Sequence, residues 1–377
     1  MSQPDVPGWE QISAAGTDPE LLSAVVHRLA RPGTGAASLL GAALERDRHA
    51  TPGEAVRAIA AATQPDVTDA ADLRRAWGRR GVRVALPGDP AYPERLLASW
   101  PDASLPLILA FRGDLRRLDR ERTVAIVGAR RATGYGKGIA AWLAEACSDA
   151  GVHVVSGGAV GIDATAHQAA IDGGTSVVLG CGHGVDYPRQ HAQPRGLFGR
   201  VLEAGGALIS EQLPNKPPRP GVVRARNRIV AALADAVVVV EGTTRSGSLL
   251  TASAAADRGI QVLAVPGDVK RPGSGAPHKL LAEGAAPCTS PDDLIEALGA
   301  SHHRPVREAE PAAPTALPSG VHELLARRWP RPIRVDELSS VLDVPAATLL
   351  ASITRARVAG EIVEGADGIR LARAPSG

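Results

Sequence analysis

The chain has 377 residues, of which 44% are hydrophobic and 22% charged, a composition that excludes wholesale disorder. Its 42 Lys and Arg residues nearly balance its 40 Asp and Glu residues, so no global field draws the chain to nucleic acid or to a membrane surface. Three scattered cysteines without a CxxC pair argue against a disulfide framework or a zinc ribbon. With no signal-peptide pattern and no long apolar run, we expect a cytoplasmic protein that does not contact membranes.

Residues 1–85 predict a helical N-terminal domain. In the stretch 27–46, apolar residues recur at helical intervals on both sides of a Pro-Gly-Thr-Gly turn. This pattern fits a SAM-like or helix–hairpin–helix-like unit whose turn offers backbone N–H groups to a phosphate. It fits a plain helical hairpin with a glycine turn at least as well.

Residues 86–299 predict a Rossmann-like domain. After a transitional segment, short runs rich in β-branched residues alternate with helix-length segments. The predicted strands are 123–128, 152–156, 176–180, 207–210, 236–241 and 261–265. The predicted helices are 136–150, 162–172, 190–204, 227–234 and 248–258. Near-continuous apolar strands separated by helices indicate an α/β fold with a doubly wound parallel sheet, covered on both faces.

The C-terminal part predicts a linker and a small domain. Residues 300–320 contain four prolines and no apolar periodicity, which is typical of a linker. In 321–377, three helices (321–329, 335–342 and 345–358) precede a hairpin around Ala366-Asp367, and together they predict a winged helix. Between 321 and 373 there are eight basic and seven acidic residues, so this domain lacks the strong basic face of an independent DNA binder.

The loop after the first strand of the sheet does not match the common nucleotide-binding motifs. GARRATGYG, from Gly128, contains no G-x-G-x-x-G, and no acid follows the second strand where a ribose would need one. Lys137 is followed by Gly138, so the P-loop pattern also fails. We therefore expect no NAD and no other cofactor. Cys181, His183 and His191 can be imagined as metal ligands, but the glycines between them offer no helical or finger geometry, so we also expect no metal ion.

Several loops at the carboxyl ends of the predicted strands suit phosphate groups. Arg130 follows the first strand, Ser156-Gly157 the second, and a loop that includes Thr243 and Ser246 the fifth. Hydroxyls, guanidinium groups and backbone N–H groups at helix starts bind anions. The segment 189–228 also carries eight basic residues against two acids. Such a run of basic residues usually forms a solvent-exposed face. Because this one lies at the edge of the sheet where ligands bind, it predicts a polyanion as the ligand.

These motifs occur in one order that resembles the DNA-processing protein A family (DprA, also called Smf). The stretches are VAIVGARRATGYG, VVSGGAVGIDATAHQAAIDGG, TSVVLGCGHGVDYPRQH, LISEQ, RNRIVAALADAVVVVEG, SGSLLTASAAADRG and VLAVPGD, between residues 124 and 268. The resemblance covers roughly residues 85–290.

The resemblance implies a cytoplasmic single-stranded DNA-binding protein of natural transformation. Such a protein protects incoming DNA, loads the RecA recombinase on it, dimerises through the Rossmann-like domain and is not an enzyme. By motif, the implied DNA-binding residues are Gly128, Arg130, Ser156, Gly157, Arg226, Asn227 and Arg228, with Lys216 in a variable loop. Val223 and Arg224 stand where the family has Phe-Pro, and His191 stands where it has Asn, which puts base stacking in doubt.

Three further interpretations stay open at this stage. A nucleotide-hydrolysing, phosphoribohydrolase-like enzyme would share this Rossmann-like fold. Such an enzyme needs a positioned carboxylate after the glycine–threonine loop, and residues 243–256, which follow the predicted strand 236–241 here, contain no acid. Asp163 and His167 could form an acid–base pair, although helix support and local packing explain them equally. Arg226 and Arg228, two apart at a helix start, cannot face the same way, so we expect one to bind phosphate and the other to pair with a protein acid.

Overall fold

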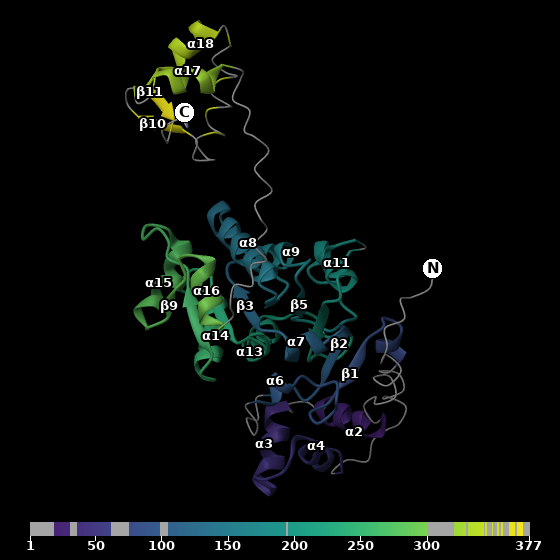
Figure 1. Cartoon of the computed structure of the whole chain (residues 1–377). Coiled ribbons are helices and arrows are strands. Elements are labelled where there is room, and N and C mark those ends of the chain that lie inside the picture. The colour runs from purple at the N-terminus through teal and green to yellow at the C-terminus, as the bar shows by residue number, and fades with distance from the viewer. Residues whose placement is uncertain are drawn as a thin grey trace. The chain divides into compact units, whose positions relative to one another are not determined.

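The computed structural model describes residues 19–30, 36–61, 75–98, 105–193, 195–299, 320–328, 331–342, 362–365 and 368–371, together with Val344, Leu349, Ile353 and Ala356. The chain divides into two compact units, Met1–His303 and Arg304–Gly377 (Figure 1). No helix in the described part of the chain is both long enough and apolar enough to cross a bilayer.

The first unit is built on a nine-stranded sheet with the order β1-β2-β6-β5-β4-β3-β7-β8-β9. The strands are β1 (Arg83–Ala85), β2 (Leu109–Gly113), β3 (Thr123–Val127), β4 (His153–Ser156), β5 (Thr175–Val178), β6 (Ala207–Ser210), β7 (Ala236–Val239), β8 (Gln261–Ala264) and β9 (Ala286–Pro287). Strands β3 to β9 pair in parallel, so their carboxyl ends share one edge. Strand order reverses between β3 and β7, the switch point where open α/β sheets bind ligands.

The sheet is covered on both faces, as the sequence pattern predicts. Along β3, Val124 and Ile126 pack into one core, whereas Ala125 and Val127 pack into the other. This alternation follows from the two-residue period of a strand. The prediction of a parallel α/β sheet is confirmed, but the predicted set of strands was incomplete. The transitional segment contains β1 and β2, which add to β6 antiparallel at one edge, and β9 extends the other edge.

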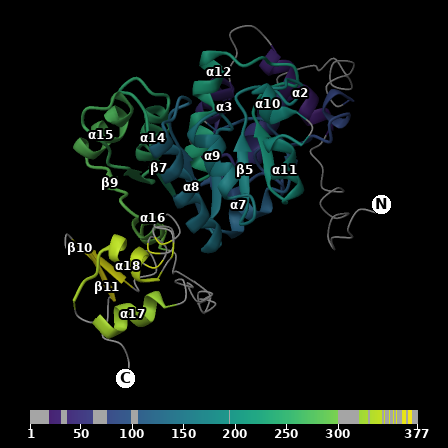
Figure 2. The same cartoon turned by 90° about the horizontal axis from the view of Figure 1, so that it is seen from above.

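The helices of the sheet domain flank the parallel strands (Figures 1 and 2). They are α8 (Gly134–Asp149), α9 (Ile162–Ala169), α10 (Arg189–Ala192), α11 (Leu197–Glu203), α12 (Pro220–Ala225), α13 (Asn227–Ala232), α14 (Ser248–Ala256), α15 (Gly275–Ala282) and α16 (Pro291–Ala297), with α6 (Glu94–Leu97), α7 (Arg116–Arg120) and a 3₁₀ turn at Pro272–Ser274 before or between them. In Figure 2, α14 and α15 lie on the β7 side, and α10 and α11 lie beyond β5.

Two helix predictions need correction. The single helix expected at 190–204 is two helices, α10 and α11, because Arg195 takes φ 62°, a left-handed conformation that no helix continues through. No helix is predicted between 204 and 227, but the structure has α12 there, with Pro220 at its first turn, where a missing N–H costs nothing.

The N-terminal helices share a core with the sheet. They are α2 (Pro19–Ala30), α3 (Ala36–Arg46) and α4 (Pro52–Ala61), drawn purple in Figure 1. Leu40, Val56 and Trp77 belong to the same buried cluster as Leu109 and Phe111 of β2. The Pro-Gly-Thr-Gly turn lies outside the described residues, so its helix–hairpin–helix interpretation and the boundary near residue 85 stay predictions.

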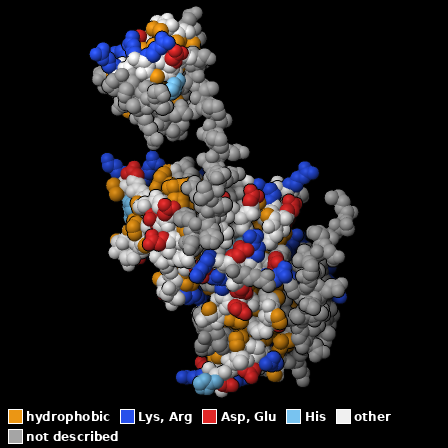
Figure 3. Space-filling view, in the orientation of Figure 1, with side chains coloured by type: hydrophobic (Ala, Val, Ile, Leu, Met, Phe, Trp, Pro, Cys, Tyr) orange, Lys and Arg blue, Asp and Glu red, His pale blue; other side chains and the backbone are white. Residues whose placement is uncertain are grey.

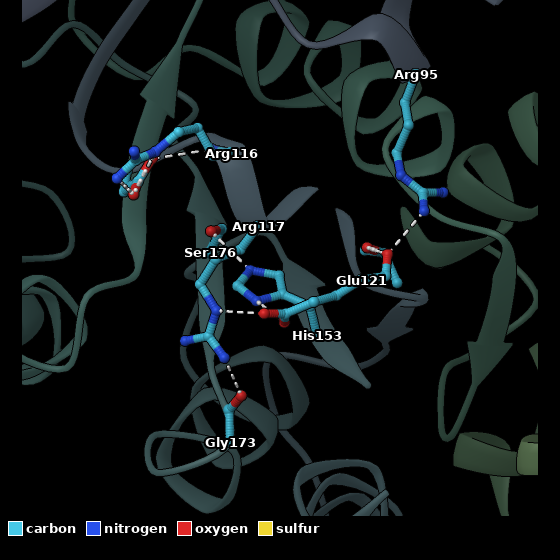
Figure 4. A network of polar contacts seen from close by, with 9 residues as sticks. Arg95, Arg116, Arg117, Glu121, His153, Gly173 and Ser176 are labelled. Carbon is cyan, nitrogen blue, oxygen red and sulfur yellow. Dashed lines mark hydrogen bonds and ion pairs between the residues drawn. The ribbon is translucent and has the colours of Figure 1, made fainter. Parts of the chain in front are cut away.

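A polar network joins the amino ends of the strands to α6 and α7 (Figure 4). Arg95 donates to Asp235 Oδ1 at 2.6 Å and to the backbone carbonyls of Leu118 and Glu121. His153 lies between Ser176 Oγ, 2.9 Å from its Nε2, and the Glu121 carboxylate, 3.7 Å from its Nδ1. These contacts lie at the edge opposite the strand carboxyl ends, so they support the fold rather than a ligand site.

The second unit contains α17 (Val321–Arg328), α18 (Val335–Leu342) and an antiparallel hairpin of β10 (Ile362–Gly365) and β11 (Gly368–Leu371). Ile333 bridges to Ile369, which ties the segment before α18 to the hairpin. The predicted third helix, 345–358, lies largely outside the described residues. Its three described residues, Leu349, Ile353 and Ala356, are buried in the core of this unit.

Buried histidines should make the first unit sensitive to acid. His167 is fully buried, and burial lowers its pKa to about 3. Its Nδ1 donates to Thr175 Oγ1, which itself donates to the Val154 carbonyl, so the folded state holds a neutral ring. The unfolded chain takes up a proton below about pH 6.5, where the folded chain does not, so stability falls as pH drops.

We predict that His167→Asn, which keeps an N–H donor, loses less stability than the wild type between pH 7 and pH 5. The difference should be about 2 kcal/mol in the free energy of unfolding. Urea titrations of both proteins at the two pH values measure it. His183, whose pKa burial lowers to about 4, is present in both proteins and cancels. Equal losses in the two proteins would contradict the assignment of a neutral His167.

Candidate nucleic-acid interface

A cavity of about 840 Å³ opens at the carboxyl edge of the sheet, at the switch between β3 and β7. Its lining comes from the loops after β3, β4 and β5, from α12 and α13, and from the loop that enters α14. Six of the ten residues that the sequence predicts for DNA binding line this cavity: Gly128, Arg130, Gly157, Arg226, Asn227 and Ser246. Residues more than a hundred positions apart therefore meet here because parallel strands end at one edge.

The cavity is strongly cationic. Its basic lining residues are Arg130, Arg219, Arg224, Arg226, Arg245 and Lys279, whereas Asp163 is its one acidic lining residue among those that the structure describes. Arg219, Arg224 and Arg245 are exposed, and no protein acceptor holds their guanidinium groups in the described structure. On the face of the first unit drawn in Figure 3, by contrast, basic and acidic side chains are interspersed. Positive charge is therefore concentrated where loops and helix starts converge.

Arg226 is a buried cation at the floor of the cavity. Only 5% of the residue is exposed, and its Nη1 donates to the Val178 carbonyl at the end of β5 at 2.8 Å. Its Nε has no partner in the described structure. A Cβ on Gly157 would lie 1.7 Å from Nη1, so glycine is the residue that lets the guanidinium pass over this loop. Burial lowers the pKa of Arg226, and Asp163 opposes that change.

Asp163 supports the loop beside Arg226. It lies in the first turn of α9, is 6% exposed, and accepts a hydrogen bond from the Ala159 N–H at 3.3 Å. Burial raises its pKa, and the nearby Arg226 acts in the opposite direction. His167, four residues on, is bonded to Thr175 instead. Asp163 and His167 thus have different hydrogen-bond partners, which supports the interpretation that Asp163 stabilises the start of α9.

The remaining cavity residues are positioned by contacts between loops. Arg130 is exposed, and its Nη1 lies 3.5 Å from the Tyr187 hydroxyl. Asn227 donates to the Gly247 carbonyl at 3.0 Å, which ties the start of α13 to the loop before α14. Ser246 shares a hydrogen bond of 2.8 Å with the buried Ser248 hydroxyl. Arg130 is therefore the sequence-predicted side chain that projects most freely at the cavity.

Four predicted residues do not line the cavity. Ser156 is fully buried and donates to the Ile126 carbonyl at 2.6 Å, so its hydroxyl is engaged inside the sheet. Arg228 makes a bidentate pair with Glu211, at 2.9 and 2.6 Å. Lys216 is exposed on the loop that meets Gly182, and Thr243 accepts a hydrogen bond from the Arg245 N–H. Of the two arginines at this helix start, Arg228 is the one that pairs with an acid.

The start of α8, the first helix after β3, is occupied by a carboxylate. Glu241, buried at the end of β7, accepts hydrogen bonds from Thr133 N–H at 2.8 Å and from the Thr133 hydroxyl at 3.0 Å. Thr133 caps α8 by accepting from the Gly136 N–H. A Cβ on Gly136 would lie 2.3 Å from Glu241 Oε2, so the carboxylate is packed directly against the first helical turn.

Sequence reasoning missed several lining residues. Tyr187 follows β5, Leu249 and Leu250 open α14, and Lys279 comes from α15. Arg219 and Arg224 belong to the basic segment that the sequence singles out, whereas a lone lysine on α15 gives no local signal. Within the described residues no three His, Cys, Asp or Glu side chains gather as a metal site. His183 donates to the Ala110 carbonyl and His191 to the Gly158 carbonyl.

Comparison with known proteins identifies the family. A family model described as DNA recombination-mediator protein A matches residues 83–299, more than half of the chain. The chain belongs to this family. Protein Smf of Escherichia coli K12 is 35% identical over 230 residues, which is 60% of this chain and 60% of that protein. The DNA processing protein DprA of Bacillus subtilis is 36% identical over 225 residues, 59% of this chain and 73% of that protein.

Two solved structures resemble the fold. DprA from Streptococcus pneumoniae has a TM-score of 0.54 and 27% identity, covering 76% of this chain and 95% of that one. DprA from Helicobacter pylori, whose structure was solved for its single-stranded DNA binding mode, has a TM-score of 0.50 and 27% identity, covering 58% and 95%. The chain spans about three fifths of the length of the first curated relatives it matches.

The Arg228–Glu211 pair should contribute stability. Both side chains are mostly buried, with 22% and 11% exposed, so removal of one partner leaves an uncompensated charge. We predict that Arg228→Ala and Glu211→Ala each lower the free energy of unfolding by about 1–3 kcal/mol. The double variant should lose less than the sum of the two, by about 1 kcal/mol or more. Urea denaturation of the four proteins measures the coupling, and strictly additive losses would refute the pair's contribution.

Proposed function

We propose that this chain binds single-stranded DNA in the cavity at the carboxyl edge of its sheet. The observation that carries the proposal is the lining itself, six cations and one buried carboxylate among the described residues. Three of those cations have free guanidinium groups, and such groups form bidentate hydrogen bonds with phosphate oxygens. Several phosphates are needed to match this charge, which favours a polyanion over a mononucleotide.

Phosphate binding of this kind depends on salt and not on sequence. A strand that neutralises several basic groups releases the counterions condensed on it, so affinity falls steeply as salt concentration rises. Arg130, which follows β3, is central because it is exposed and because its guanidinium makes only a long contact, 3.5 Å, with the Tyr187 hydroxyl among the described residues. Gly157 and Arg226 shape the floor below it, and Asn227 fixes the loop before α14.

The finer assignments rest on family membership. They are a cytoplasmic role in natural transformation, protection of incoming DNA, loading of the RecA recombinase, and a homodimer joined through the Rossmann-like domain, without enzymatic activity. The nucleotide-hydrolysing alternative requires a positioned carboxylate. Asp163, the acid in the described lining, accepts a hydrogen bond from the Ala159 N–H and lies beside a buried arginine, which supports a structural role for it.

The second unit fits a winged helix that assists binding without providing the main site. Its sequence from 321 to 373 has eight basic and seven acidic residues. Two of its arginines are already engaged, Arg327 with Glu323 and Arg328 with Glu337. The proline-rich segment before it supports an independent unit. The N-terminal helices share a core with the sheet, which supports a structural contribution from them.

Arg130→Ala should weaken binding of a single-stranded oligonucleotide about tenfold or more, because an exposed guanidinium at the sheet edge is lost. The slope of log affinity against log salt should also become shallower by about 0.7, the change expected for one phosphate contact on a single strand. Fluorescence anisotropy at several salt concentrations measures both quantities.

The matched control is Arg131→Ala. Arg131 is also exposed but does not line the cavity, so its removal changes the net charge equally and should alter affinity far less. Circular dichroism checks that both variants fold. Equal losses of affinity in the two variants would show that binding follows the overall charge and not the cavity.

A fragment comprising residues 1–312 should keep most of the affinity for single-stranded DNA, because the cavity lies wholly within the first unit. The affinities of this fragment and the full chain are compared on the same oligonucleotide, with the oligomeric state of each measured by light scattering. A fragment that is folded and assembles like the full chain but has lost nearly all binding would place the primary site in the second unit.

A further inference from the structure

The cavity has an apolar wall in addition to its cations. Leu249 and Leu250 at the start of α14, Val230 on α13 and Val223 on α12 all line it. Leu250 is 44% exposed, Leu249 and Val223 are half-buried, with Leu249 packed partly against the core, and Val230 is buried, so Leu250 carries most of the accessible apolar surface of the wall. Phosphate groups gain nothing from exposed leucine side chains. The wall therefore calls for a ligand that has apolar surface as well as charge.

Tyr187 provides a second surface of this kind. It is half-buried, it follows β5, and it is the one Phe, Tyr or Trp side chain on the lining in the described structure. The α14 wall follows β7. In the sheet order β5-β4-β3-β7 these two strands are three spacings apart, about 14 Å. Tyr187 and the α14 wall therefore reach the lining from different strands, and the Arg130 guanidinium from the loop after β3 lies 3.5 Å from the Tyr187 hydroxyl.

We propose that the wall formed by Leu249 and Leu250, together with Tyr187, binds the nucleobases of the DNA strand while the arginines hold its phosphates. This inference rests on the proposed function and names how the same site takes its ligand. Every base has an apolar face, so contact with leucine methyl groups and with the Tyr187 ring is tolerant of sequence. The strand lies across the sheet edge with its bases turned inward.

This arrangement selects single strands. In a duplex the base faces are stacked on one another, so the apolar wall has no base to contact. Only the attraction between the arginines and the phosphates then contributes to binding. Charge alone does not discriminate in this way, because a duplex carries more phosphates per unit length than a single strand. The selectivity of the site for single-stranded DNA thus comes from Leu249, Leu250 and Tyr187 and not from the arginines.

The test compares two oligonucleotides with equal numbers of phosphates, one of thymidines and one of abasic residues. The wild-type protein should bind the thymidine strand about tenfold more tightly, with the same salt slope for both strands. Leu250→Gln should lower the affinity for the thymidine strand several-fold and leave the affinity for the abasic strand unchanged. The salt dependence of both affinities should stay the same. Leu250 is partly exposed on a helix, and glutamine is a good helix former, so the fold is preserved.

The matched control is Val269→Gln. Val269 is 82% exposed and does not line the cavity, so this variant removes apolar surface of a similar kind elsewhere and should change neither affinity. Equal wild-type affinity for the two strands, with clear binding of both, would overturn the base-binding wall and leave the proposed function standing. Binding of neither strand would overturn both. A loss in Leu250→Gln that is equal for the two strands would also overturn the wall.

Discussion

The geometry of the cavity depends on a buried guanidinium that has no room to move. Arg226 passes over Gly157 and donates to the end of β5, and a single Cβ at residue 157 would occupy the same space as its Nη1. An arginine keeps its proton even when it is buried, so the positive charge stays at the floor of the cavity. One contact thereby fixes the loop after β4, the carboxyl end of β5 and the start of α13 relative to one another.

The arginines around this floor are arranged at a cost to the free protein. Several cations face one cavity with a single buried carboxylate among the described lining, so they repel one another until a ligand neutralises them. A protein optimised only for stability would pair them, as it pairs Arg228 with Glu211 and Arg95 with Asp235. Sites that bind tightly commonly sacrifice stability in this way. The contrast between paired and unpaired arginines within one sheet domain is what distinguishes structural arginines from binding ones.

Much of this arrangement could be predicted from the sequence, because it follows from local patterns. The apolar strands, the helices between them and the shared carboxyl edge placed Gly128, Arg130, Gly157 and Asn227 in one region. The sequence could not decide which of Arg226 and Arg228 faces inward, since that choice depends on Gly157, seventy residues away. Tyr187 and Lys279 were missed because their place on the cavity lining likewise depends on residues far away in the sequence. The edge strands β1 and β2 were missed because they lie outside the regular alternation of strand and helix: β1 has three residues, and β2 is followed only by the five-residue α7.

The carboxylate of Glu241 has a consequence for the kind of ligand that this fold can accept. Dinucleotide-binding relatives of the architecture seat a pyrophosphate on the helix that follows the first strand of the parallel sheet. Here that position is filled from within: Glu241 already accepts from the Thr133 N–H and hydroxyl and is packed against the first turn of α8. The protein supplies its own anion where a nucleotide cofactor would bring one, so an incoming phosphate is repelled from α8. The anion site is thereby displaced from the start of α8 to the arginines that line the neighbouring cavity at the same sheet edge, which can bind several phosphates of one strand.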